Sequence, residues 1–462
     1  MSRQQAIDNA AAYFDSGEFQ RILARRVACA SESQEPDSAE ALVAYLADEM
    51  IPALEVLGFT CRTLANPVKG GPFLIAHRCE TDPAFTLLSY GHGDVVRGYA
   101  SQWLEGLSPW QLQVRGDKWY GRGSADNKGQ HTINLGALAQ TIAARGGRLG
   151  YDVKFLIEMG EEMGSPGLRE VCAAERAALA ADVLVASDGP RLSATRPTLF
   201  LGSRGAFNFE LRITARQGGH HSGNWGGLLS NPGVRLANAI ASMVSPTGRI
   251  LVPGLLPRSL PQNVRRALAG IEVGGGPDDP AIDPQWGEPG LTPAEKVFGW
   301  NTFEVLAFKT GNPDAPVNAI PGHGVAYCQL RYVVDSDHAN FVAHMRAHLD
   351  AHGFDDVQII PSREVAPATR LDPDNIWVRR TIDSIVQTTG KPVDLLPNLG
   401  GTLPNDAFSD ILGLPTVWVP HSYAACSQHA PNEHLLGSVA RESLQLMAGL
   451  FWDLGDVAAP SA

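Results

Sequence analysis

Short apolar runs alternate with longer stretches of helical periodicity in the first part of the chain. Residues 131–147 and 165–179 have helical periodicity, and the second stretch begins with Ser-Pro, a common helix start. Buried strands that alternate with helices predict a sheet covered by helices on both faces. The runs that predict such strands are PFLIAH, FTLLSYG, VKFLIEMG and DVLVASD.

Residues 16–50 precede this alternation and predict helices of their own. Phe19, Leu23 and Val27 recur at the spacing of one helix face. Ser38 is a candidate N-cap for the second of these helices, because serine oxygens often accept hydrogen bonds from the first free amides of a helix.

The pattern changes near residue 205. Residues 206–216 and 324–335 alternate apolar and polar side chains, as half-exposed antiparallel strands do. Residues 231–244 and 337–353 predict amphipathic helices, the latter ending at a glycine. These elements predict a small α+β domain with a two-layer arrangement. Residues 248–296 within it are rich in Gly and Pro and predict a long loop insertion.

The helix and strand alternation returns after the small domain, in residues 375–390, 415–420 and 437–454. The expected fold class is therefore α/β, a doubly wound mixed sheet with an inserted α+β domain. The expected boundaries are 1–204 for the first part of the large domain, 205–368 for the inserted domain and 369–462 for the second part.

Composition narrows the class of partner. A net charge of −12 argues against nucleic acid or an anionic membrane as the main partner. The six cysteines are scattered without a CxxC pair, which is typical of reduced thiols in a cytoplasmic protein. The first residues lack the apolar segment of a secretory signal, and no apolar run reaches the length of a membrane span. We therefore expect a cytoplasmic protein that acts on a small molecule.

Polar side chains with metal-binding chemistry follow several of the expected strands. In open α/β sheets, ligands collect at the carboxyl ends of the strands. Two histidines and several carboxylates that converge there suit a hydrolytic metal site. The residues are His92 and Asp94 after FTLLSYG, Glu161 and Glu162 after VKFLIEMG, Asp188 after DVLVAS, His429 beyond PTVWVP, and Asp126 in the loop YGRGSADNKGQ.

Other motifs are weaker. GRGSAD lacks the third glycine of a dinucleotide-binding turn, and no GK[ST] follows that would make a phosphate loop. GGHHSG places a serine near histidines but lacks the G-x-S-x-G elbow of an acyl-transfer serine.

The motifs GHGDVV, YGRGSADNKG, GEEMGS, ASDGP, HHSGNWGG and QHAPNEHL occur in the order seen in the M20 metallopeptidases, which the chain resembles over about residues 20–440. That family of co-catalytic zinc hydrolases includes dipeptidases, carboxypeptidases and deacylases. The DNKG and HSGxxGG motifs are most similar to the carnosinase-like dipeptidase branch and the acetylornithine and succinyl-diaminopimelate deacylases.

The resemblance implies two Zn²⁺ ions per subunit, with Mn²⁺ or Co²⁺ as substitutes. It implies that His92 and Asp188 bind one ion, that Glu162 and His429 bind the other, and that Asp126 bridges the two. It also implies that the Asp126–Asn127 peptide is cis. Two roles fall to neighbouring carboxylates. Asp94 is expected to accept the second N–H of His92, and Glu161 is expected to act as the general base.

The resemblance also implies substrate contacts and a dimer. His221 is expected to stabilise the oxyanion, and Arg331, with Gly401 and Thr402 of the GGT segment, to bind a substrate carboxylate. The inserted domain is expected to act as a lid and to form a homodimer, in which His221 reaches the partner subunit's site. Thr402 stands where serine is common in the family, and the 248–296 segment is longer than usual.

The expected function is hydrolysis of a dipeptide or N-acyl amino acid that carries a free carboxylate, by water activated by two metal ions. One alternative keeps the fold and changes the bond, as a deacylase or C–N hydrolase acting on an unusual catabolic amide. An alternative from another class is a non-catalytic metal-binding dimerisation protein. That alternative predicts that the general base or a metal ligand has been replaced. Glu161 and all five metal positions are intact.

Overall fold

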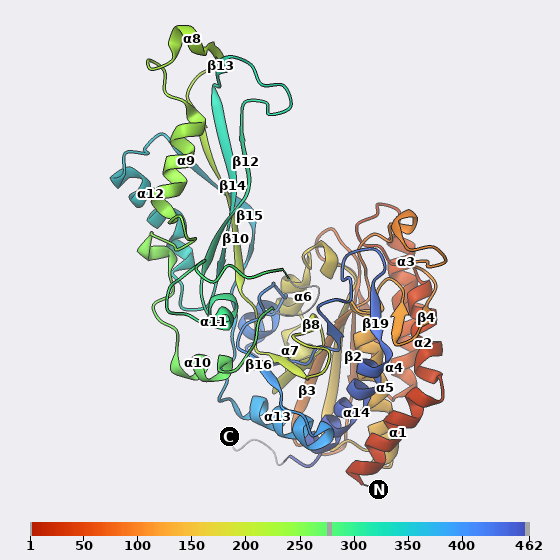
Figure 1. Ribbon diagram of the computed structural model, residues 1–462. Coiled ribbons are helices and arrows are strands. Elements are labelled where there is room, and N and C mark those ends of the chain that lie inside the picture. Colours follow the sequence, from red (N-terminus) through yellow and green to blue (C-terminus); the bar gives the residue numbers. More distant parts are fainter. Residues whose placement is uncertain (1, 275–279, 458–462) are drawn as a thin grey trace. The chain divides into compact units, whose positions relative to one another are not determined.

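The structure is a computed structural model that describes residues 2–274 and 280–457. The chain divides into two compact units (Figure 1). The first consists of Met1–Leu201, Leu371–Leu396 and Pro404–Ala462, and the second of Gly202–Arg370 and Pro397–Leu403. Nothing in the sequence pattern predicted that 397–403 would belong to the second unit.

An eight-stranded mixed sheet forms the centre of the first unit. Strands β3, β6, β7 and β17 run parallel where they pair, whereas β1 and β2 add antiparallel edges. Apart from their first residues, β3 and β6 are buried throughout, as their apolar runs predicted. The strand order is β1 (Thr60–Leu64), β2 (Phe73–Arg78), β6 (Asp152–Glu158), β3 (Thr86–His92), β7 (Val183–Ala186), β17 (Thr416–Trp418), β9 (Thr198–Phe200) and β16 (Asp394–Leu396).

Helices cover this sheet, so the expected α/β class is confirmed. The helices α1, α5 and α14 pack against one another (Figure 1). The helices are α1 (Arg3–Asp15), α2 (Glu18–Ala28), α3 (Ala39–Ala44), α4 (Ile51–Val56), α5 (Lys128–Ala144), α6 (Leu168–Ala174), α7 (Arg176–Leu179), α13 (Ile376–Thr389) and α14 (Gly437–Leu454). Smaller ladders join β4 (Gln113–Arg115), β5 (Lys118–Tyr120) and β19 (His434–Leu436), and β8 (Pro190–Arg191) with β18 (Ser422–Tyr423).

Two expected helix starts differ from the structure. Ser38 precedes α3, but its hydroxyl donates to the Glu35 carbonyl oxygen at 2.8 Å and makes no cap. The Ser-Pro pair at 165–166 lies in a turn, and α6 begins only after Gly167, which has φ of 86°. The Ser165 hydroxyl donates to Glu158 Oε1 at 2.9 Å, so both serine hydroxyls have partners other than a helix amide.

The second unit has two layers, as expected for an α+β fold. Its antiparallel sheet has the order β12 (Thr302–Thr310), β14 (His323–Tyr332), β10 (Gly205–Thr214) and β15 (Gln358–Ala366). Buried and partly exposed residues alternate along β10, so one face packs against α9 (Pro232–Met243) and α12 (Phe341–Ala351). A short ladder joins β11 (His220–His221) to β13 (Ala319–Ile320), followed by α8 (Ser222–Trp225).

The 248–296 segment is less irregular than expected. It contains α10 (Gln262–Leu268), and α11 (Pro293–Phe298) begins within it. The Thr292 hydroxyl caps α11 by accepting from the Glu295 amide, and the Glu295 carboxylate accepts from the Thr292 amide. Helices of this length are too short for hydrophobic periodicity to reveal them. Residues 275–279 of the expected loop lie outside the described residues.

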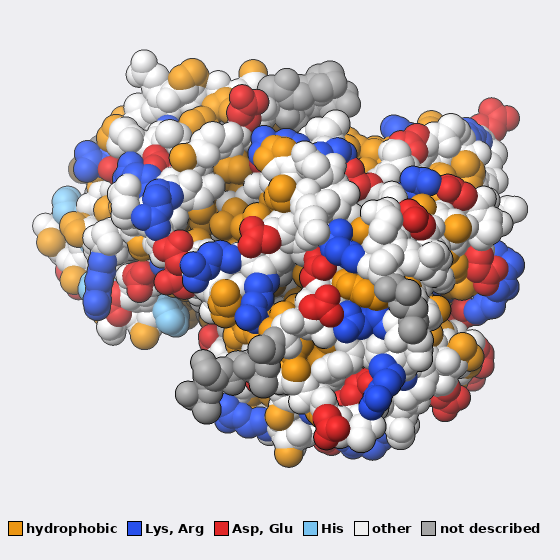
Figure 2. All heavy atoms as spheres, turned by 90° about the horizontal axis from the view of Figure 1, so that it is seen from below, with side chains coloured by type: hydrophobic (Ala, Val, Ile, Leu, Met, Phe, Trp, Pro, Cys, Tyr) orange, Lys and Arg blue, Asp and Glu red, His pale blue; other side chains and the backbone are white. Residues whose placement is uncertain are grey.

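Charged side chains of both signs are mixed over the described part of the face in Figure 2. The described part of this face therefore shows no single acidic area that would account for the net charge of −12. No helix in residues 2–274 or 280–457 combines the length and hydropathy needed to cross a bilayer.

Candidate metal centre

The structure brings His92, Asp126 and Asp188 together at the end of β3. His92 Nε2 lies 3.0 Å from Asp126 Oδ1 and 3.8 Å from Asp188 Oδ2. All three side chains are buried, and one ligand atom from each lies within 4.8 Å of the others. An imidazole and two carboxylates in this arrangement can hold a divalent cation.

A second group shares Asp126. His429 Nε2 lies 2.9 Å from Asp126 Oδ2 and 3.1 Å from Glu162 Oε2. These ligand atoms also lie within 4.8 Å of one another. Asp126 therefore presents Oδ1 to the His92 group and Oδ2 to the His429 group, which is the arrangement of a bridging carboxylate.

The topology of the sheet explains why these residues meet. Strands β3 and β6 are parallel neighbours that end at His92 and Glu158, and β7 ends two residues before Asp188. The Asp126–Asn127 peptide is cis, as expected. The carboxyl ends of the parallel strands thus bring His92, Glu162 and Asp188 to one edge, whereas Asp126 and His429 come from loops.

Asp94 has a second role beside the expected contact with His92. The nearest acceptor to His92 Nδ1 is the Asp94 backbone oxygen, at 3.1 Å, whereas the carboxylate oxygen lies 3.4 Å away. The carboxylate accepts hydrogen bonds from the backbone amides of Glu161 and Glu162, each at 3.1 Å. Asp94 therefore fixes the turn that carries both glutamates, in addition to its contact with His92.

Sequence reasoning missed Glu433. Its carboxylate is buried, accepts from the backbone amides of Ala125 and Asp126 at 3.0 Å each, and pairs with Arg122 at 2.6 Å. It thereby holds the loop that presents Asp126. The only sequence signal was its position inside the QHAPNEHL motif.

Converging negative charge dominates the electrostatics of the centre. Burial, with the neighbouring Asp126 charge, raises the pKa of Glu162 to about 7 and that of Asp188 to about 6. Burial alone would lower the pKa of His92, but hydrogen bonds with Asp126 and Asp94 raise it well above its ordinary value. Hydrogen bonds to Asp126 and Glu162 raise the pKa of His429 to about 11.

The residues present fit a pair of divalent cations. Carboxylate oxygens and imidazole nitrogens are donors that zinc and manganese accept. So many carboxylates in one buried place are costly without counter-charges, and two divalent ions would nearly balance them. The carboxylates are those of Asp94, Asp126, Glu161, Glu162 and Asp188.

Glu161 lies beside this cluster. One of its carboxylate oxygens, Oε2, is 4.0 Å from His92 Nε2, and within the described residues its carboxylate has no hydrogen-bond donor. Its backbone is fixed by Asp94, whereas its carboxylate remains available to another group. Burial raises its pKa well above the ordinary value.

The expected carboxylate-binding residues lie in the second unit. Arg331 Nη1 donates to Thr402 Oγ1 at 2.6 Å, and Arg331 Nε donates to Gln329 Oε1 at 2.9 Å. Arg204, which the sequence reasoning did not single out, donates to the Gly400 carbonyl oxygen from Nε at 3.1 Å and from Nη2 at 3.0 Å. Gly401 is exposed, and a side chain added there would first meet Leu399 Cδ2, at 3.9 Å from its Cβ. The unit thus brings Arg331 and the GGT segment together.

His221 also belongs to the second unit. It is exposed at the end of β11, and its Nδ1 accepts a hydrogen bond from the Gly223 amide at 3.2 Å. Its Nε2 has no hydrogen-bond partner among the described residues. A free ring nitrogen on an exposed histidine is available to a ligand.

Comparison with known families decides the class. Residues 88–453 match the family described as Peptidase family M20/M25/M40. The chain belongs to this family. The resemblance inferred from the motifs is confirmed, and the family accounts for the order in which the metal-ligand motifs occur.

Several curated relatives are dipeptidases, and one is a succinyl-diaminopimelate desuccinylase of Legionella pneumophila, 30% identical over 205 residues that cover 42% of this chain and 50% of the relative. The chain is 34% identical over 193 residues to the Beta-Ala-His dipeptidase of Mus musculus, a match that covers 41% of this chain and 39% of the relative. It is 31% identical over 232 residues to the Cysteinylglycine-S-conjugate dipeptidase of Corynebacterium striatum, covering 48% of this chain and 49% of the relative. These matches thus span half or less of the relatives' own lengths.

Solved structures extend the likeness to the whole fold. Human carnosine dipeptidase 1 aligns with a TM-score of 0.72 at 22% identity, covering 98% of this chain and 99% of that one. A metallo-carboxypeptidase of the M20 family from Sulfolobus solfataricus aligns with a TM-score of 0.77 at 22% identity, covering 95% and 100%. These alignments confirm the α/β architecture with its inserted unit.

Proposed function

We propose that this chain is a metallodipeptidase that hydrolyses the amide bond of a dipeptide with a free carboxylate. One observation carries the proposal, namely that Asp126 turns one carboxylate oxygen toward His92 and the other toward His429. A bridging carboxylate between two ligand groups is the feature of two-metal hydrolases. Relatives named as dipeptidases favour a peptide over other amides.

The ligand set divides into two groups. His92 and Asp188 would hold one ion, Glu162 and His429 would hold the other, and Asp126 would serve both, with zinc as the metal and Mn²⁺ or Co²⁺ as substitutes. Such ions, when bound, polarise the scissile carbonyl and lower the pKa of water. Asp94 accepts a hydrogen bond from the backbone amide of Glu162, and Glu433 accepts one from that of Asp126. Each contact fixes the backbone of a proposed ligand.

Glu161 is the general base. Its carboxylate faces the cluster, 4.0 Å from His92 Nε2, and takes no hydrogen bond from the described residues. It can therefore accept the proton of the attacking water and pass it to the leaving amine. Glu162 is its neighbour in sequence but lies 3.1 Å from His429 Nε2, so the two glutamates have separate roles.

The second unit supplies substrate recognition. Arg331 binds the substrate carboxylate through its guanidinium, and Thr402 and Gly401 add donors beside it. The chain acts as a homodimer through this unit, and the exposed His221 stabilises the oxyanion in the partner subunit's site. The six free thiols suit a reducing compartment, the cytoplasm.

A substrate panel tests the function. The zinc- or manganese-loaded protein is given a dipeptide, the same dipeptide as its C-terminal amide, and an N-acetyl amino acid with the same C-terminal residue. We expect the free dipeptide to be hydrolysed fastest and the amidated one slowest. Preference for the N-acyl compound would support a deacylase instead. Failure to hydrolyse any amide with either metal would support the non-catalytic alternative.

A further inference from the structure

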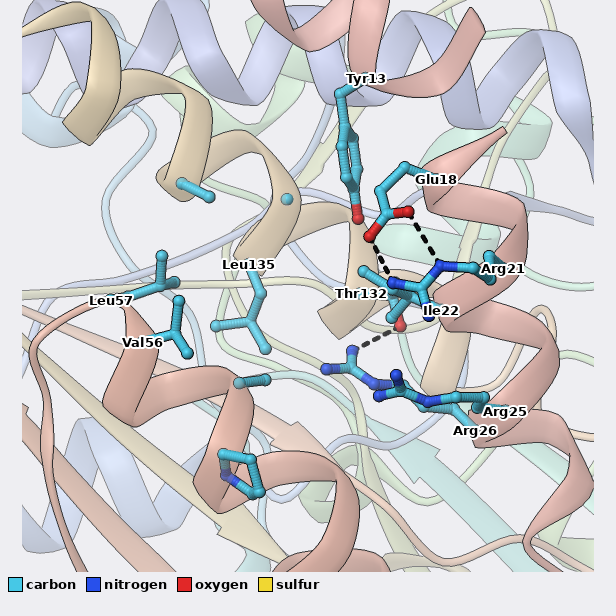
Figure 3. A pocket seen from close by; sticks show the side chains of 14 residues that line it. Tyr13, Glu18, Arg21, Ile22, Arg25, Arg26, Val56, Leu57, Thr132 and Leu135 are labelled. Atoms are coloured by element: carbon cyan, nitrogen blue, oxygen red, sulfur yellow. Dashed lines mark hydrogen bonds and ion pairs between the residues drawn. The ribbon is translucent and has the colours of Figure 1, made fainter. Parts of the chain in front are cut away.

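A cavity with a volume of about 400 Å³ opens in the first unit, away from the metal ligands. It lies between α2, α4 and α5, and Tyr13 of α1 closes one side (Figure 3). Its apolar wall includes Ile22, Val56, Leu57 and Leu135. None of the five proposed metal ligands lines it.

Arg26 lies at the inner end of this cavity and is only 1% exposed. Its Nη1 donates to Thr132 Oγ1 at 2.6 Å, whereas its Nε has no hydrogen-bond partner in the part of the chain that the structure describes. In Figure 3 its guanidinium reaches from α2 toward Thr132 and Leu135. Within residues 2–274 and 280–457, no carboxylate lies within ion-pair distance of it.

The neighbouring arginines are different. Arg21 pairs with Glu18 at 2.5 Å and Arg25 with Glu49 at 2.8 Å. Two of the three guanidinium charges that line the cavity are thus neutralised, and that of Arg26 is not. The end of α2 contributes only a partial negative charge, which does not balance a buried cation. A buried, unpaired charge that lines an open cavity is an anion site by its chemistry.

We propose that this cavity binds an organic monocarboxylate with a short apolar chain. The carboxylate accepts a hydrogen bond from the Nε–H of Arg26, which has no partner among the described residues, and its charge balances that of the guanidinium. The apolar chain packs against Leu135, Ile22 and Leu57, which an inorganic anion cannot exploit. The Tyr13 side chain at the rim closes the site.

The site is independent of the proposed hydrolysis. Thr132 and Leu135 lie in the second turn of α5, beyond the Asp126 loop, and neither is a proposed metal ligand. Binding can therefore be measured on the metal-loaded full chain without substrate. A failure here leaves the dipeptidase proposal untouched, and the reverse also holds.

Calorimetric titration of the full chain tests the proposal with three probes, namely hexanoate, 1-hexanol and inorganic phosphate. We expect saturable binding of hexanoate at one site per chain, and at least tenfold weaker binding of both other probes, about what one charge-assisted hydrogen bond contributes. Hexanol binding as tightly as hexanoate would contradict the role of Arg26. Phosphate binding as tightly would contradict the role of the apolar wall.

Arg26→Met keeps the length and removes the charge. We expect it to weaken hexanoate binding by at least about tenfold and to leave the melting temperature of the ligand-free chain unchanged or higher, because an unpaired buried charge is lost. Arg62→Met is the matched control, since Arg62 is half-exposed, pairs with Glu175 and does not line the cavity. That control should bind hexanoate as the wild type does.

A second variant keeps the test decisive if Arg26→Met fails to fold. Ala139 lines the cavity from α5, and Ala139→Phe fills part of the space without touching the charge. It should reduce hexanoate binding and preserve the fold. Wild-type hexanoate binding in either folded cavity variant, or no binding to the wild-type chain, would overturn the proposal.

Discussion

The Asp94 carboxylate lies 3.1 Å from the backbone nitrogen of Glu161 and accepts its hydrogen bond. The other carboxylate oxygen accepts the amide of Glu162 at the same distance. One buried side chain therefore orients both the proposed base and a proposed ligand. The position of the two glutamates depends on this contact as much as on the end of β6.

We expect Asp94→Asn to lower activity by about 10–100-fold, the range for partners that orient metal ligands. The asparagine amide would place a donor where one backbone N–H now donates, so one of the two hydrogen bonds is lost. Turnover and metal content are measured together. Asp94→Ala loses both hydrogen bonds, so its activity should be lower still. Wild-type activity in both variants would show that the turn needs no carboxylate.

Glu161→Gln tests the base. We expect turnover to fall by about 10²–10⁴-fold, the usual contribution of general acid–base catalysis, while KM and metal content stay near wild type. Glu162→Gln is the informative comparison, since that variant should lose metal. If the Glu161 variant remains within about tenfold of wild type, another group accepts the proton.

Arg331→Met tests carboxylate recognition. Loss of its charged contact should raise KM for a free dipeptide by about 10–100-fold, which corresponds to one charge-assisted hydrogen bond. The variant should hydrolyse the C-terminal amide of the same dipeptide no worse than wild type does. A loss equal for both substrates would show that Arg331 supports the fold of β14 instead.

The buried His421 predicts sensitivity to acid. Its Nε2 lies 3.0 Å from Asn134 Oδ1, its Nδ1 has no hydrogen-bond partner among the described residues, and burial holds its pKa well below the ordinary value. The unfolded chain therefore binds a proton at His421 that the folded chain does not, so the contribution of His421 to stability is complete above about pH 6.5 and is lost as the pH drops below it. Urea unfolding of the metal-free protein across this range measures the slope, and His421→Gln should flatten it.

Much of the centre could be predicted because strand ends are visible in the sequence. His92 and Asp188 follow apolar runs that form β3 and β7, and parallel pairing brings such ends together. The hydrogen bonds of Asp94 and Glu433 to distant backbone amides could not be predicted, because they depend on tertiary geometry. The same holds for 397–403, whose place in the second unit is set by contacts such as Thr402 with Arg331.

Subunit mixing tests the role of His221 in trans. Glu161→Ala and His221→Ala should each be nearly inactive alone. In a mixed dimer, one site combines an intact Glu161 with an intact partner histidine, so random exchange should restore roughly a quarter of the sites. Mixed dimers without regained activity would place His221 outside the partner's site.

The central claim is that both metal ions bind Asp126. Diffraction from crystals of the zinc-loaded protein, recorded at the zinc absorption edge, tests this claim most directly. The account predicts two zinc ions per chain, each about 2.0–2.2 Å from a different oxygen of Asp126. One ion should contact His92 and Asp188, and the other Glu162 and His429. A single ion at saturating zinc, or two ions of which only one contacts Asp126, would contradict it.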